Sequence, residues 1–302
     1  MQLTLALLVP RAADAHPLAH AAATQWTWEP LVVVPLAIAT ALYAAGVARL
    51  WRRAGVGHGV ARLEAASFAA GTLTLVVALL SPVAWLSQIL FSVHMTQHTL
   101  LMLVAAPLLT FGQPVYAWLW AFDDSRREPV ARAIRRRAVL RGWRWLTAAL
   151  TVFLVQAAAL WLWHVPALYE AALRSDAVHA FEHLCLVLSA SLFWWAMVHG
   201  RYGRAGYGLA VLYVFLTAVH SSALGALLVV SPNAWYADYV RQGDAWHIDA
   251  LGDQQLAGLL MWIPASVIFI VFGLALFAAW LGESEKRAAF GTADTSARGV
   301  RS

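Results

Sequence analysis

The sequence predicts an all-α, polytopic membrane helix bundle with seven transmembrane helices, and three observations support this class. Of the 302 residues, 61% are hydrophobic and only 12% are charged, whereas a soluble domain of this length carries about 25% charged residues. Apolar runs of spanning length recur along the chain, and the 16 Trp residues suit the aromatic belts of two membrane interfaces. The single cysteine, Cys185, excludes an intrachain disulfide.

Seven apolar runs are long enough to cross a bilayer as helices. They cover approximately residues 30–50, 65–85, 88–111, 145–163, 178–198, 208–230 and 256–280. Prolines within or at the ends of these runs are compatible with membrane helices, because neighbouring helices can satisfy the carbonyl groups that proline frees. Residues 30–280 therefore form the predicted seven-helix transmembrane domain.

The placement of the basic residues predicts the orientation of the bundle. Eighteen of the 21 Lys and Arg residues lie in the C-terminal tail or between the first and second, third and fourth, or fifth and sixth runs. Cytoplasmic loops carry such an excess, so we expect the N-terminus outside the cell and residues 281–302 as a loosely ordered cytoplasmic tail. The arginines between residues 123 and 144 are interpreted as this topology signal, with an anionic-lipid site as the alternative and no nucleic-acid partner.

The N-terminal segment carries features of a signal peptide. Residues 1–15 contain a short apolar run followed by Ala13-Asp14-Ala15, which resembles a signal-peptidase site, although no positive charge precedes the run. Residues 16–29 would then be an extracytoplasmic segment. Cleavage after Ala15 would expose His16, whose amine and imidazole, with His20 nearby, could chelate Cu(II).

Two histidine pairs stand out within the apolar runs. His94 and His98 are four residues apart, and His179 and His183 repeat the spacing. On a helix such residues share one face, about 5–6 Å apart, so each pair can offer two ligands to one metal ion. Imidazole is costly to bury in lipid, which favours a functional role. The predicted orientation places both pairs in the outer part of the membrane, where we expect them to face each other.

Other polar residues share this predicted depth. His164 and Asp253 complete the candidate ligand set. Glu182 could orient an imidazole or be an interfacial carboxylate, Gln97 would provide packing or support, and the sulfur of Met95 would favour Cu(I).

Hydrogen bonding between helices is the alternative role for these histidines. It is the favoured interpretation for His220, while His58, His199 and His247 are expected in loops or at interfaces.

Copper is the metal that we favour for the two pairs, with zinc or haem as alternatives, because neutral imidazole binds several transition metals. Stacked haems across the bilayer would need histidines a dozen or more residues apart on one helix, which this spacing does not provide. One haem held between the two pairs remains open.

Four blocks of the sequence contain these residues. They are His94-Met-x-Gln97-His98 followed by Pro107-Leu-Leu, Trp161-x-x-His164-x-Pro166-x-x-Tyr169, His179-x-x-Glu182-His183 leading to Phe193-Trp194-Trp195, and Asp253-Gln254-Gln255-x-x-Gly258-x-x-x-Trp262. Over roughly residues 30–280 the chain resembles the multi-spanning CtaG family, assembly factors of caa-type cytochrome c oxidases. The resemblance implies a role in making an active haem–copper oxidase, with oxidase subunits as partners, in the plasma membrane of a prokaryote.

The resemblance and the paired histidines together predict an assembly factor that binds or passes copper and is not itself an enzyme. One alternative is a zinc- or iron-dependent membrane hydrolase or hydroxylase, with Glu182 or Asp253 as general base. A metal-free assembly scaffold, whose histidines bond between helices, is the other.

Overall fold

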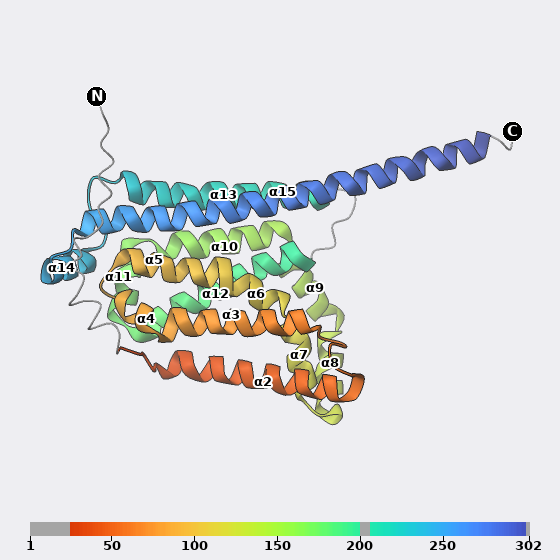
Figure 1. The fold of residues 1–302 in the computed structure, drawn as a ribbon, viewed down its shortest axis with the longest axis horizontal. Coiled ribbons are helices and arrows are strands. Elements are labelled where there is room, and N and C mark those ends of the chain that lie inside the picture. Colours follow the sequence, from red (N-terminus) through yellow and green to blue (C-terminus); the bar gives the residue numbers. More distant parts are fainter. Residues whose placement is uncertain (1–24, 200–205, 300–302) are drawn as a thin grey trace.

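The structure, a computed structural model, describes residues 25–199 and 206–299. These residues form a bundle of helices without strands (Figure 1). The candidate signal peptide at residues 1–15, the histidines His16 and His20, and most of the predicted extracytoplasmic segment lie outside the described residues.

The predicted spans correspond to long helices, except that the third is divided. The long helices are α2 (Pro30–Ala54), α3 (Arg62–Leu80), α10 (Ala149–Trp163), α12 (Asp176–His199), α13 (Gly206–Val230) and α15 (Ala250–Gly299). The third span consists of α5 (Phe91–Thr99), the π-helical stretch η1 (Leu100–Ala105) and α6 (Ala106–Phe111). Shorter helices occupy the connections: α4 (Pro82–Leu86), α7 (Pro114–Ala121), α8 (Asp124–Ile134), α9 (Arg137–Leu146), α11 (Pro166–Arg174) and α14 (Ala237–Trp246).

Five of the described helices are long and apolar enough to cross a membrane, and two bent helix pairs raise the number to as many as seven. The segment from α5 to α6 bends by 53° into α7, and α9 bends by 60° into α10. The structure thus confirms an all-α polytopic bundle.

Proline residues mark several of the boundaries. Pro30, Pro82, Pro114 and Pro166 stand in the first turn of their helices, where the missing N–H has no helical partner to lose. Pro107 also stands in the first turn of its helix, α6, but that helix continues from η1 inside the third span. Because Pro107 cannot donate to the carbonyl four residues earlier, the α-helical bonding pattern is interrupted there, and the wider π-helical turn precedes it.

The helices α13 and α15 run side by side along one edge of the bundle, and α2 lies along the opposite edge (Figure 1). The close approach of α13 and α15 depends on two glycines. A Cβ atom added at Gly258 would lie 2.6 Å from the carbonyl oxygen of Gly225, and one added at Gly225 would lie 2.9 Å from that of Gly258. Only glycine allows the two backbones to pack this closely.

The two ends of the bundle differ in composition. The arginine-rich helices α8 and α9 lie at one end, where α2 also ends (Figure 1). The helices α4, α11 and α14 lie at the other end, where α5 begins. The helix α15 continues to Gly299, through most of the predicted tail. The tail lacks proline and contains several alanines, which favour helix.

Candidate metal centre

The two histidine pairs meet between α5 and α12. The ring centroids of His94 and His179 are 5.4 Å apart, and those of His98 and His183 are 5.6 Å apart. Within each pair the rings are 4.3 Å apart, as expected for neighbours one turn apart on a helix. The predicted meeting of the two pairs is therefore confirmed.

The imidazoles of the cluster are buried and poorly satisfied by hydrogen bonds. His94 and His98 share one bond of 2.8 Å between their Nε2 atoms, so one ring donates and the other accepts. Four other ring nitrogens are buried without a partner among the described residues, namely His94 Nδ1, His98 Nδ1, His179 Nε2 and His183 Nε2. Such atoms are costly to bury unless a ligand satisfies them.

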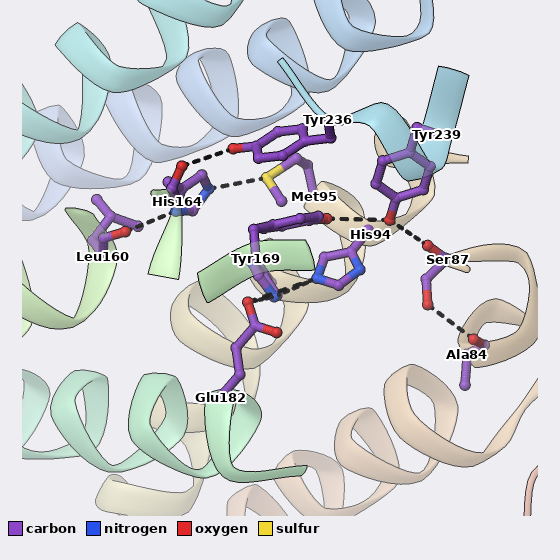
Figure 2. A network of polar contacts seen from close by, with 11 residues as sticks. Ala84, Ser87, His94, Met95, Leu160, His164, Tyr169, Glu182, Tyr236 and Tyr239 are labelled. Carbon is purple, nitrogen blue, oxygen red and sulfur yellow. Dashed lines mark hydrogen bonds and ion pairs between the residues drawn. The ribbon is translucent and has the colours of Figure 1, made fainter. Parts of the chain in front are cut away.

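Glu182 points into the same cluster from α12. Its side chain is fully buried, and its Oε1 atom lies 3.5 Å from His98 Nε2 and 3.9 Å from His94 Nε2 (Figure 2). Neither carboxylate oxygen has a hydrogen-bond partner among the described residues. The interfacial role considered for Glu182 is therefore wrong, because the carboxylate faces the histidines rather than the membrane surface.

The donor atoms form two overlapping groups of three. His94, His179 and His183 make one group, and His94, His98 and Glu182 make the other, with the donor atoms of each group within 4.8 Å of one another. Tetrahedral ligands with bonds of about 2.0–2.1 Å lie about 3.3 Å from each other. The donor atoms would therefore have to move closer to one another to bind an ion, and an ion held by both His94 and His98 at Nε2 would displace the hydrogen bond between them.

Asp253 has a different role from the predicted ligand role. Its carboxylate accepts hydrogen bonds from the backbone N–H groups of Phe91, at 2.6 Å, and Ser92, at 3.3 Å. It belongs to neither donor group. Leu90, which precedes α5, has no side-chain acceptor, so Asp253 of α15 caps this helix and places a negative charge at its positive end. The carboxylate thereby fixes the first turn of the helix that carries His94.

Replacing Asp253 with alanine should loosen that first turn. We expect a loss of about 0.5–2 kcal/mol in the free energy of unfolding, the range for a lost helix cap. Metal binding should weaken but persist, because the donor atoms remain. Thermal unfolding and a metal titration of the purified protein measure both effects. Asp249→Ala is the matched control, since Asp249 caps α15 through Leu251 N and does not contact α5. Equal metal affinity in both variants would contradict the capping role.

His164 stands beside the cluster with its tautomer fixed. Its Nδ1 donates to the carbonyl oxygen of Leu160 at 2.7 Å, which leaves Nε2 without a proton. That Nε2 atom lies 3.4 Å from the sulfur of Met95, and the ring centroid lies 6.0 Å from that of His98 (Figure 2). His164 is outside both donor groups, but its Nε2 and the Met95 sulfur offer a soft pair of donors next to them.

Gln97 ties the site to α3. Its amide nitrogen donates to the carbonyl oxygen of Ala78 at 2.7 Å, while its Oε1 atom is buried without a partner among the described residues. This contact fixes the face of α5 that points toward α12. Cys185, by contrast, is half-buried and belongs to neither donor group.

Three tyrosines next to the histidines were not predicted as part of the site. Tyr239 donates to the carbonyl oxygen of Ser87 at 2.6 Å, so the bond of 3.1 Å between the Tyr169 and Tyr239 hydroxyls must be donated by Tyr169. Tyr236 donates to the carbonyl oxygen of His164 at 3.0 Å (Figure 2). These residues come from α11 and the region of α14, which carry too little apolar periodicity to be predicted. Only the block that contains Tyr169 indicated one of them.

The remaining histidines described by the structure lie apart from the centre. His220 accepts from Trp161 at 3.4 Å and donates to Gln156 at 3.2 Å, so it is satisfied as predicted. His58 lies between α2 and α3, and His199 and His247 lie at helix ends, also as expected.

Comparisons with known proteins support the resemblance seen in the sequence. A family model described as cytochrome c oxidase caa3 assembly factor matches residues 41–283. A protein of Mycobacterium leprae is 25% identical over 272 residues, which cover 87% of this chain and 40% of the relative. A protein of Mycobacterium bovis is 26% identical with the same coverage. Both are described as uncharacterized, the chain spans less than half of their length, and no solved structure matches it significantly.

Proposed function

Because the chain belongs to the cytochrome c oxidase caa3 assembly factor family, we propose that it helps to assemble a haem–copper oxidase by holding a copper ion and passing it to an oxidase subunit. It would act in the plasma membrane of a prokaryote, as the mycobacterial relatives suggest. The ligands are His94, His98, His179 and His183 with Glu182, and beside them lie a further imidazole, that of His164, and the soft thioether of Met95. The copper ion is cargo rather than a permanent cofactor.

One observation supports this proposal above the others. Among the described residues, eleven buried side-chain nitrogen and oxygen atoms have no hydrogen-bond partner, and six of them belong to the four histidines and Glu182. Native proteins rarely leave buried polar groups unpaired. A metal ion held by one of the two donor groups would give ligand contacts to members of this set, such as His179 and His183 or Glu182, whereas hydrogen bonds between helices would have paired these atoms already.

The surroundings of the cluster favour copper over haem. Two cavities touch the histidines, of about 30 Å³ and about 40 Å³, whereas sites for cofactor-sized molecules measure about 300–1,000 Å³. An ion fits such spaces and a porphyrin does not. Imidazole nitrogens with a thioether nearby are donors that suit copper, and zinc is the metal that the same nitrogens would otherwise hold.

The same cavities disfavour the hydrolase or hydroxylase alternative, because neither of these spaces beside the histidines has room for a lipid or amide substrate. A metal-free scaffold is the second candidate. It predicts that the purified protein binds no copper and that an oxidase defect in a deletion strain is not relieved by added copper.

The proposal predicts that copper binding depends on the paired histidines. Purified wild-type protein should bind about one copper ion per chain, and His94→Ala and His183→Ala should each lose most of it. Elemental analysis after incubation with Cu(I) and removal of free ions measures the content. In cells, the same variants should lower the amount of active oxidase.

His220→Ala is the matched control, because His220 is also an intramembrane histidine but is fully hydrogen-bonded outside the cluster. It should keep the wild-type copper content. Unchanged copper in both His94→Ala and His183→Ala would overturn the assignment of ligands, and zinc in place of copper would overturn the assignment of the metal.

A further inference from the structure

A small cavity connects the histidine cluster with the end of the bundle where α5 begins. It is lined by side chains of graded exposure, from the exposed Gln88 through the half-buried Glu29 and His179 to the buried His183 and Gln97. The cavity measures about 30 Å³, which is room for a water molecule or an ion of similar size. It therefore has the size and the position of a passage for ions.

Several polar atoms of the cavity wall have no partner. Glu29 Oε1, Gln97 Oε1, His179 Nε2 and His183 Nε2 are buried without hydrogen bonds among the described residues. His183 is 5% exposed and Gln97 is 1% exposed, so both side chains of the inner wall are shielded from bulk solvent. All four atoms can coordinate a cation when the imidazoles are neutral.

Glu29 is held over the outer part of this cavity by the segment that precedes α2. Thr27 donates through its backbone N–H to the carbonyl oxygen of Leu80 at 3.0 Å and through its hydroxyl to that of Leu79 at 3.1 Å. These bonds fix the segment across the end of α3. The carboxylate is thus positioned by the fold rather than left free on a loop.

A second carboxylate lies close to the first. Burial and the neighbouring charge of Asp176 both raise the pKa of Glu29. Asp176 is exposed in the first turn of α12, three residues before His179. Asp176 does not line the cavity, but it stands one helical turn before His179, which does, so its charge adds to that of Glu29 beside the outer part of the cavity and favours a cation there.

We propose that this cavity is the entrance through which the copper ion reaches the histidines, with Glu29 as its first contact, the charge of Asp176 beside it and His179 as the next contact. This inference rests on the proposed function, since it gives the route to the same cluster. The ion keeps its charge and oxidation state throughout, and water leaves it as carboxylate oxygen and then imidazole nitrogen take its place. Glu29 and Asp176 set the rate of loading, whereas the final content depends on the cluster.

The test is the rate of copper uptake by the purified, metal-free, full-length protein. Cu(I) is supplied from a coloured chelator, whose absorbance is followed after rapid mixing, and the final content is measured afterwards. Glu29→Gln combined with Asp176→Asn should slow uptake by about tenfold or more, because the local cation concentration falls. Ala180→Leu, which narrows the cavity without removing a donor, should also slow it. Both proteins should reach the wild-type copper content.

Asp244→Asn is the control, because Asp244 is an exposed carboxylate of α14, which lies at the same end of the bundle but does not line the cavity (Figure 1). It should load at the wild-type rate. Wild-type rates in both the double variant and Ala180→Leu, with full copper content, would overturn the entrance and leave the proposed function intact. A wild-type protein that takes up no copper would overturn both.

Discussion

Replacing Glu182 with leucine is expected to stabilise the metal-free protein and to remove tight copper binding. The Glu182 side chain is fully buried and both of its carboxylate oxygens lack a hydrogen-bond partner among the described residues. A buried polar group without a partner costs about 1–3 kcal/mol, and a leucine of similar volume carries no such group. The free energy of unfolding of the metal-free variant should therefore rise by about this amount.

Copper binding should change in the opposite direction. The Glu182 Oε1 atom lies 3.5 Å from His98 Nε2 and is the oxygen donor of the group that it forms with His94 and His98. Its removal should weaken copper binding by at least about 10–100-fold, the range found when even a group that only supports a metal ligand is lost. Thermal unfolding without metal and a competition titration with a copper chelator measure the two effects.

Two further variants make this result specific. Glu182→Gln keeps the shape and a polar group, so it should weaken copper binding with a smaller gain in stability. Glu128→Leu changes a glutamate that is exposed on α8, and should leave copper binding unchanged. A Glu182→Leu protein that binds copper as tightly as wild type, or that unfolds more easily without metal, would contradict the role given to this carboxylate.

A methyl group at Gly258 is expected to disturb both the bundle and the site. An added Cβ would lie 2.6 Å from the Gly225 carbonyl oxygen and 2.8 Å from Val229 Cγ2. Since one contact is backbone, α13 and α15 must separate rather than adjust a side chain. Overpacking of this kind costs about 1–3 kcal/mol. Gly258→Ala should lower the thermal unfolding temperature and weaken copper binding, because α15 also carries the Asp253 cap of α5.

Gly273→Ala tests whether the effect depends on position. Gly273 lies on the same helix, and a Cβ there would meet only Val214 Cγ1 at an ordinary distance of 3.7 Å. The two variants add the same methyl group to α15, so helix propensity changes equally. Thermal unfolding and size-exclusion chromatography in detergent compare them. Similar behaviour of the two proteins would show that the contact between Gly225 and Gly258 is not important.

Much of the fold could be predicted because lipid imposes simple rules on the sequence. The ends of runs such as 208–230 and 178–198 lie within two residues of the ends of α13 and α12. The division of the third span was harder to predict, since Pro107 indicates an interruption but not its form. The connecting helices α11 and α14 are short, mixed in polarity and stabilised by tertiary contacts, so apolar runs do not reveal them.

The histidines of the centre could be predicted because the sequence indicates both their spacing along a helix and their depth in the membrane. Helical periodicity placed His94 above His98 and His179 above His183, and the distribution of arginines brought the two pairs to one level. The direction of a single side chain was not readable in this way. Asp253 shares the predicted depth of the histidines, but its carboxylate accepts a hydrogen bond from the start of α5. Glu182, for which the sequence allowed two roles, lies beside the imidazoles instead.

The bond between Asp253 and the start of α5 also has a consequence for the order in which the protein is made. It joins positions 162 residues apart, and a nascent chain emerges with its N-terminal part first. All five histidines of the centre therefore enter the membrane before the carboxylate that fixes the first turn of α5 has been synthesised. A chain interrupted before Ala250 would contain these imidazoles but no cap, so the last helix to be inserted completes the support of the proposed copper centre. Unfinished molecules would therefore hold copper more weakly than finished ones.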